Sequence, residues 1–143
     1  MTEKKSQELQ LFKEINQAWL PPPDLTISEW ADLKRKISSE ASAEPGQWRT
    51  SRAEYQREIM NAISNPLIER VIVMTAAQVG KTELLLNTIG YFVDQEPSPI
   101  LILQPTLQMG QSFSKDRLDP MIRDTAVLRE KVKNARSRNS GNT

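Results

Sequence analysis

The residues whose types and spacing could carry out chemistry lie in the turn Thr75–Thr82, which reads Thr-Ala-Ala-Gln-Val-Gly-Lys-Thr. The spacing is that of the phosphate-binding pattern G-x-x-x-x-G-K-[S/T], with Thr75 in the place of the first glycine. Gly80 lacks a Cβ atom, so its backbone can approach phosphate oxygens closely. Lys81 would place a positive charge on the β- and γ-phosphates, and the Thr82 hydroxyl would be a Mg²⁺ ligand. The turn therefore predicts a site for a nucleoside triphosphate with Mg²⁺.

The backbone of the same turn would supply the remaining donors. A triphosphate needs several N–H groups that converge on its oxygens, and a tight loop followed by a helix N-terminus provides them. Thr75 can replace glycine at the first position if its φ angle is negative. The alternative is that the turn only follows a buried strand and that its lysine is an ordinary surface residue. The expected phosphate-binding residues are Thr75, Ala76, Ala77, Gln78, Val79, Gly80, Lys81 and Thr82.

Two short apolar runs and the segment between them must position this turn. We expect Val71–Met74 to be a strand before the turn, Lys81–Val93 a helix after it, and Ile100–Leu103 a second strand. A strand, a helix and a strand of this length form a βαβ unit with parallel pairing and a right-handed crossover. The sequence thus predicts an α/β fold with part of a P-loop NTPase-type parallel sheet, preceded by N-terminal helices.

Upstream of the turn, two capping-box patterns each predict the start of a helix. Thr26–Glu29 would begin a helix that runs from Ser28 to about Ile37, with Trp30 and Leu33 facing inward. Ser51–Glu54 would begin a second helix. Its apolar residues are Tyr55, Ile59, Met60 and Ile63.

Two residues of this second helix could bind a base. The ring of Tyr55 could stack on adenine, and the amide of Gln56 could both donate to and accept from the edge of the base. The alternative is a partly buried tyrosine beside a solvated glutamine. On position alone the two interpretations remain open.

Downstream, a second polar cluster could contact nucleic acid. Thr106 leaves the second apolar run at its C-terminal end, where ligands of open α/β sheets bind. Leu107–Lys115 is expected to be a helix, and Ser114, Lys115 and Arg117 gather near its end. They could contact a nucleic-acid backbone, or they could form a solvated face.

The two ends of the chain are predicted to differ from the rest. Ser6–Leu20 carries an apolar helical stripe, which fits either a packing helix or a docking arm for a partner. Pro21–Pro23 would stop that helix and form a stiff linker, so we divide the chain into residues 1–23 and 24–143. The basic tail Lys131–Thr143 is expected to be either a disordered end or a loop before a further strand.

The composition excludes several kinds of chemistry. The 143 residues contain neither Cys nor His, which excludes thiol nucleophiles, zinc sites and Ser-His-Asp hydrolysis within this chain. A net charge of +1 argues neither for nor against nucleic acid. The apolar runs are too short to span a bilayer and the N-terminus lacks a signal sequence, so we expect an intracellular protein with no membrane contact.

Together these segments resemble the large terminase subunit of tailed bacteriophages, and among these the lambda-like packaging motors. The resemblance covers most of residues 25–143. It is carried by the phosphate loop TAAQVGKTE, by the upstream ISEWADLKRKIS, EPGQWRT and YQREIM, and by the downstream LQPTLQMGQSFSKDRLDPMI.

The resemblance implies that the chain is the ATP-binding part of the motor that packages viral DNA into the capsid. It implies ATP and Mg²⁺ as cofactors, and a parent protein that is also an endonuclease cutting concatemeric DNA. The implied partners are double-stranded viral DNA, the small terminase subunit, the capsid portal and further copies of the same chain, all in the host cytoplasm. Residues 1–23 would dock on the small subunit.

The resemblance also assigns individual residues. Tyr55 and Gln56 would match the adenine-binding element of the family, and Pro105-Thr106 would match a segment that faces DNA in related translocases. The expected DNA contacts are Thr106, Ser114 and Arg117.

Two departures from the family pattern limit these expectations. Gln78 stands where many large terminases place an arginine, which puts an arginine finger in this loop in doubt. No apolar strand ending in an acidic pair follows, so we expect a fragment cut inside the ATPase domain, with no catalytic residues of its own. The alternatives are another P-loop DNA translocase or helicase, or a truncated, non-catalytic prophage interaction module.

Overall fold

The structure, a computed structural model, describes residues 24–40 and 44–132. The predicted helix Ser6–Leu20, the proline linker and the tail from residue 133 onward lie outside the described residues. No helix within the described ranges is both long enough and apolar enough to cross a membrane. The elements in chain order are α2 (Ile27–Lys34), β1 (Lys36–Ile37), β2 (Gly46–Gln47), the 3₁₀ helix η1 (Thr50–Gln56), α3 (Arg57–Ile63), α4 (Lys81–Asp94), α5 (Leu107–Phe113), the π-helical turn η2 (Ser114–Leu118), α6 (Asp119–Asp124) and α7 (Ala126–Lys131).

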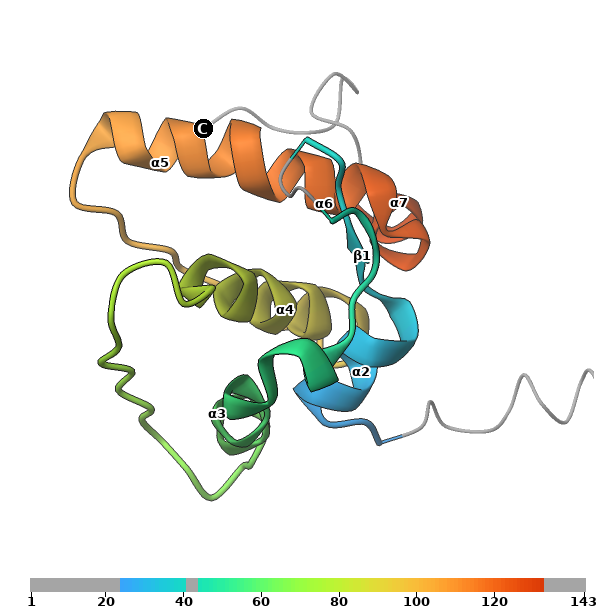
Figure 1. Cartoon of the computed structure of the whole chain (residues 1–143), viewed down its shortest axis with the longest axis vertical. Helices are drawn as coiled ribbons and strands as arrows, with labels where there is room; N and C mark the ends of the chain where they lie inside the picture. The colour runs from blue at the N-terminus through green and yellow to red at the C-terminus, as the bar shows by residue number, and fades with distance from the viewer. Residues whose placement is uncertain (1–23, 41–43, 133–143) are drawn as a thin grey trace, which may run out of the picture.

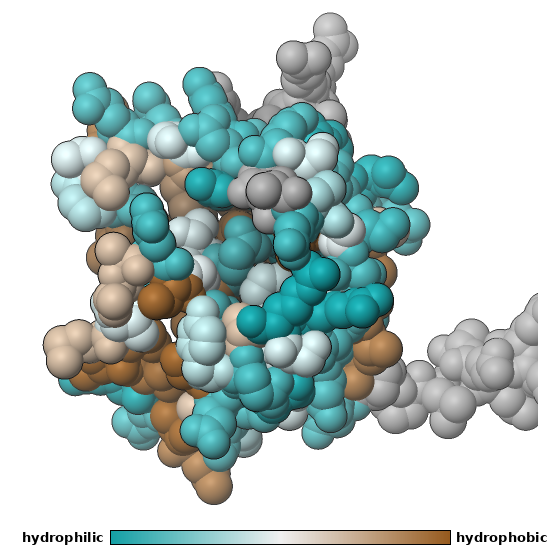
Figure 2. Space-filling view, in the orientation of Figure 1, coloured by the Kyte–Doolittle hydropathy of each residue, from teal (hydrophilic) through white to brown (hydrophobic). Residues whose placement is uncertain are grey.

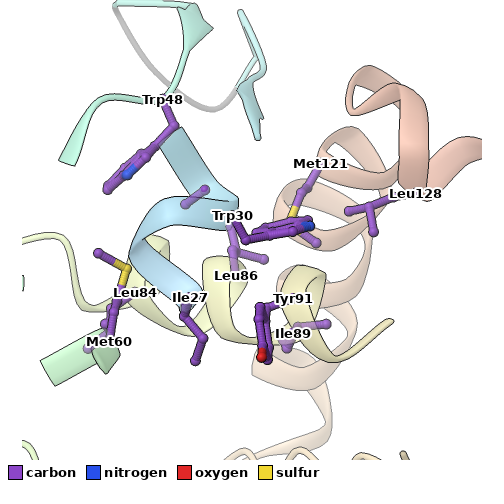
Figure 3. Packing of buried hydrophobic residues seen from close by; sticks show 11 residues of the cluster. Ile27, Trp30, Trp48, Met60, Leu84, Leu86, Ile89, Tyr91, Met121 and Leu128 are labelled. Atoms are coloured by element: carbon purple, nitrogen blue, oxygen red, sulfur yellow. The ribbon is translucent and has the colours of Figure 1, made fainter. Parts of the chain in front are cut away.

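Helix α4, predicted from the segment after the phosphate turn, is the element around which the others pack. Figure 1 shows α4 in the middle of the molecule, with α2 and α3 on one side and the α5–α7 segment on the other. Helices α2, α3 and α7 contact α4 directly. The core lies between these helices (Figure 3), and its buried apolar residues are Ile27, Trp30, Ala31, Trp48, Met60, Leu84, Leu86, Ile89, Tyr91, Met121 and Leu128.

The Trp30 side chain packs against α4 at Gly90, where the missing Cβ leaves room for the indole. The indole is fully buried, and Gly90 lies directly beneath it. A Cβ atom placed on Gly90 would be 2.3 Å from Cη2 of Trp30, well inside van der Waals contact. Gly90 is therefore required for close packing between α2 and α4, although glycine disfavours a helix interior.

We expect the Gly90→Ala variant to be less stable by about 1–3 kcal/mol, the usual cost of overpacking a core. Glycine to alanine inside a helix normally stabilises by about 1 kcal/mol, so the expected sign is reversed. The matched control is Gly110→Ala in α5, where the nearest atom to a new Cβ is Gln104 Cβ at 3.9 Å. Urea unfolding followed by circular dichroism measures both changes. If the urea midpoints of both variants shifted in the same direction, the packing role of Gly90 would be contradicted.

The first capping box is confirmed, but the helix that it starts is shorter than predicted. The Thr26 hydroxyl accepts a hydrogen bond from Glu29 N, and Glu29 Oε2 accepts one from Thr26 N at 2.9 Å. The hydrogen bonds that the Glu29 carboxylate accepts from Thr26, first from its backbone N–H and then from its hydroxyl, lower the pKa of Glu29. Arg35 is extended, with ψ of 129°, and so the helix ends at Lys34. The inward orientation predicted for Leu33 is wrong, because its side chain is 66% exposed.

The second capping box is absent. Residues 50–56 form the 3₁₀ helix η1, whose N-cap makes no side-chain hydrogen bond and whose Ala53 has non-helical angles. Instead of reaching back to its own helix start, the Glu54 carboxylate accepts hydrogen bonds of 2.5 and 3.1 Å from Arg57. The α-helix α3 accordingly begins only at Arg57.

The predicted parallel pairing of Val71–Met74 with Ile100–Leu103 is not shown by the described residues. Their only strand pairing is antiparallel, between β1 and β2, with Lys36 opposite Gln47. The two apolar runs are instead extended segments outside any sheet. The parallel pairing was predicted from the order of apolar run, helix and apolar run along the chain. In the described part of the chain, the helices α2, α3 and α7 contact α4.

Both apolar runs nevertheless keep the alternating burial that is typical of strands. Val73 and Ile102 pack against the core, while Ile72, Met74, Leu101 and Leu103 are each more than 80% exposed. In Figure 2 apolar surface gathers at the lower left, where the chain that follows α3 runs in Figure 1. The molecule is thus a mixed helical fold with one small sheet, compatible with an α/β domain.

Candidate phosphate-binding site

The backbone of the turn before α4 has the conformation that an anion-binding loop requires. Gly80 is the N-cap of α4 and has left-handed angles of φ 77° and ψ 23°. Gln78, in the middle of the turn, is the one non-glycine residue with positive φ, 60°, among those that the structure describes. Thr75 therefore has a negative φ angle, which is the condition for replacing the first glycine of the phosphate-binding pattern. A turn in which left-handed residues stand next to right-handed ones can direct successive backbone N–H groups toward a common concavity, which favours an anion.

The helix start and the lysine add positive charge at the same place. The first N–H groups to donate within α4 are those of Glu83 and Leu84, which reach Gly80 O at 3.0 and 3.1 Å. The N–H groups of Lys81 and Thr82 precede them and are left for a ligand or for water. The Lys81 ammonium crosses the loop and donates to Ala76 O at 2.7 Å. A phosphate oxygen could replace that carbonyl as its acceptor.

Tyr55 and Gln56, far away in sequence, contact the rim of this loop. The Tyr55 hydroxyl donates to Val79 O at 2.8 Å, and Gln56 Nε2 donates to the same oxygen at 3.0 Å. Tyr55 is 58% exposed and so presents its ring to solvent, whereas Gln56 is buried. Gln56 Oε1 is buried without a hydrogen-bond partner. Gly80 is needed here too, because a Cβ would lie 2.7 Å from Gln56 Nε2.

Of the three predicted DNA contacts, Arg117 lines a hollow next to the phosphate loop, and Thr106 and Ser114 do not. A hollow of about 530 Å³ opens beside the phosphate loop, and Arg117 lines it together with Lys81 and Thr82. Thr106 is the N-cap of α5, where its hydroxyl accepts from Met109 N at 3.2 Å. Ser114 begins the π-helical turn and does not line the hollow. The other lining residues are Leu85, Gln104, Gln108, Met109, Ser112 and Phe113.

One ion pair next to the loop was missed in the sequence. Glu83, the residue after Thr82, binds the buried guanidinium of Arg35 at 3.0 Å. Arg35 fell inside the predicted helix Ser28–Ile37, so no local pattern indicated that it would turn toward α4. The one feature of the sequence that could have indicated this ion pair was the acidic residue directly after Lys81 and Thr82.

Comparisons with known proteins identify relatives of this chain. Residues 42–143 match the model of the phage terminase large subunit gpA, ATPase domain. The chain is 35% identical over 109 residues to the terminase large subunit of Enterobacteria phage P21, covering 76% of the chain and 17% of that protein. It is also 35% identical over 107 residues to the terminase large subunit of Escherichia phage lambda, covering 75% of the chain and 16% of that protein. No solved structure matches the chain.

Proposed function

The chain belongs to the gpA family of phage terminase large subunits, within its ATPase domain, and on this premise we propose that it forms the ATP-binding part of a DNA-packaging motor. The observation that carries the proposal is the left-handed cap at Gly80, with the Lys81 ammonium lying across the loop that precedes it. The chain spans only 17% and 16% of its two relatives, so the endonuclease activity belongs to the parent protein in this proposal.

The residues present fit a triphosphate with Mg²⁺. The left-handed backbone at Gln78 and Gly80 supports a ring of N–H donors for phosphate oxygens. Lys81 would bind the β- and γ-phosphates, and the exposed Thr82 hydroxyl would be a ligand of Mg²⁺. The ion, when bound, neutralises charge on the phosphates. We assign phosphate binding to the whole loop Thr75–Thr82.

We assign recognition of the base to Tyr55 and Gln56. The exposed Tyr55 ring beside Val79 offers a surface on which adenine can stack. Gln56 Oε1, buried and without a partner, can accept a hydrogen bond from an exocyclic amino group. Adenine carries its amino group at C6, whereas guanine carries a carbonyl oxygen at C6 and its amino group at C2. With Gln56 Oε1 placed against C6 of the base, the pair would favour ATP over GTP.

We further propose that residues 24–143 are the N-terminal portion of the ATPase domain and that its sheet is of the parallel P-loop type. The alternating burial around Val73 and Ile102 supports strands that pair with other parts of the domain rather than with each other. Residues 1–23 would dock on the small terminase subunit. Assembly with the portal and with further copies, in the host cytoplasm, would bring double-stranded DNA to Thr106, Ser114 and Arg117.

Titration of the chain with a fluorescent ATP analogue, with and without Mg²⁺, tests the proposal. We expect saturable binding that strengthens with Mg²⁺ and that ATP displaces more effectively than GTP. The chain with no added nucleotide and a titration with AMP, which lacks the β- and γ-phosphates, are the controls. Failure of Mg-ATP to bind a folded chain would refute the assignment of the loop.

A further inference from the structure

Helix α2 contacts α4 through two neighbouring basic residues that reach carboxylates far apart on that helix. Lys34, the last residue of α2, donates to Asp94 Oδ2 at 2.7 Å, at the C-terminal end of α4. Arg35, the next residue, donates to Glu83 Oε2 at 3.0 Å, in the first turn of α4. The end of α2 and the residue after it thus connect to both ends of the helix that starts at the phosphate loop.

The buried charge of the Arg35 guanidinium has the Glu83 carboxylate as its counterion. Its side chain is 2% exposed, so its charge has little contact with water. Burial lowers the pKa of Arg35, and the charges of Glu83 and Asp124 oppose that shift. A second contact runs from Arg35 Nη1 to Lys36 O, while Arg35 Nε lacks a partner. A buried charge of this kind is stable only with its counterion, and so the pair holds Glu83 in one place.

Glu83 is tied to the phosphate-binding turn on its other side. Its backbone N–H donates to Gly80 O at 3.0 Å, closing the first turn behind Lys81 and Thr82. Fixing Glu83 therefore fixes the direction of the two N–H groups that precede it. The pairing also neutralises a carboxylate that would otherwise stand next to bound phosphates and repel them.

We propose that the Arg35–Glu83 ion pair is a positioning device that sets the affinity of the loop for the triphosphate. The inference rests on the proposed function, since it assigns a role toward the same nucleotide. Neither residue touches the phosphates in this proposal. Both act through the first turn of α4.

Three variants of the whole chain test the proposal, with Mg-ATP affinity and thermal melting as the two measurements. We expect Glu83→Ala and Arg35→Met each to weaken Mg-ATP binding by about tenfold, the order seen when a supporting residue of a binding group is lost. Lys34→Met is the matched control, because it removes the neighbouring ion pair at the other end of α4. It should lower the melting temperature but change Mg-ATP affinity less than about twofold.

The outcomes separate the inference from the function on which it rests. Glu83 is 20% exposed and Arg35 keeps its contact with Lys36 O, so the Glu83→Ala chain is expected to fold even if Arg35→Met does not. Mg-ATP binding by Glu83→Ala within twofold of wild type would overturn the positioning role while leaving the proposed function intact. An equal loss of Mg-ATP affinity in the Lys34→Met variant would also overturn the positioning role. A wild-type chain that does not bind Mg-ATP would refute both.

Discussion

A Lys81→Ala variant is expected to lose Mg-ATP affinity by about a hundredfold or more while keeping its fold. Removing one partner of a close charge pair costs about 2–5 kcal/mol, and each 1.4 kcal/mol is a factor of about ten. The ammonium is exposed and donates to Ala76 O, a contact that water can replace. Surface changes of this kind usually alter stability by less than about 0.5 kcal/mol. Titration with a fluorescent ATP analogue and a thermal melt measure the two quantities.

The control for this variant is Lys36→Ala, which removes an exposed lysine of β1 and makes the same change in net charge. It should leave the affinity for Mg-ATP within about twofold, because long-range charge effects are screened by salt. Equal losses in the two variants would indicate a diffuse charge effect instead of a phosphate contact at the loop. In a parent protein that hydrolyses ATP, Lys81→Ala should also abolish the ATPase activity.

The parts of the fold that sequence predicted well are those specified by residues close together in the chain. The capping box at Thr26 and Glu29 involves residues three apart and is confirmed. The helix after the phosphate turn runs from Lys81 to Asp94, one residue longer than predicted. A Gly-Lys-Thr turn after an apolar run favours this helix start whatever surrounds it.

The parts that sequence missed depend on partners far away in the chain. Ser51 and Glu54 have capping-box spacing, but Arg57 competes for the Glu54 carboxylate and the helix starts later. Ile37 was placed in a helix, yet it pairs opposite Gly46 in a two-residue ladder. The parallel pairing is not shown in the described residues, and an apolar run of four residues specifies a strand without specifying its neighbour.

In the candidate site, too, the features specified by nearby residues were predicted and those that depend on distant residues were not. The loop geometry at Gly80 followed from its sequence, because only a residue without a Cβ adopts this left-handed cap next to Gln56 at no cost. The contact of Gln56 with Val79 O joins residues 23 apart and had no signature beyond the resemblance to a family. The Arg35–Glu83 pair joins residues 48 apart, and its one signal in the sequence was the acidic residue directly after Thr82.

Asp94 is the residue whose loss should affect the fold most, because it joins three helices. Its side chain is 3% exposed. Burial by itself would raise the pKa of Asp94, but the hydrogen bonds that it accepts outweigh burial and lower the pKa below the usual range. The donors are Lys131 of α7, Lys34 and Trp30 Nε1 of α2, and the neighbouring Gln95.

The sign of the pH dependence follows from this shift. A carboxyl group with a lowered pKa in the folded state binds fewer protons there than in the unfolded chain, where its pKa is about 3.9. Its stabilising contribution is therefore complete above the unfolded pKa and is lost as the pH falls toward the folded one. The Asp94 contribution should be full at pH 7 and should decrease below about pH 4.

Replacing Asp94 with alanine is expected to lower the free energy of unfolding by about 3–5 kcal/mol at pH 7, the usual cost of breaking a buried ion pair. Lys34 would lose its carboxylate acceptor, Lys131 would keep only the backbone oxygen of residue 94, and Trp30 Nε1 would remain buried without an acceptor. Urea unfolding of both chains at pH 7, 5 and 3 measures the difference, which should be similar at pH 7 and 5 and smaller at pH 3. Asp116→Ala is the control, because that exposed carboxylate accepts from Ser112 and should cost less than about 0.5 kcal/mol. A difference for Asp94→Ala that is the same at all three pH values would show that lost packing, and not the ionised carboxylate, stabilises the junction of α2, α4 and α7.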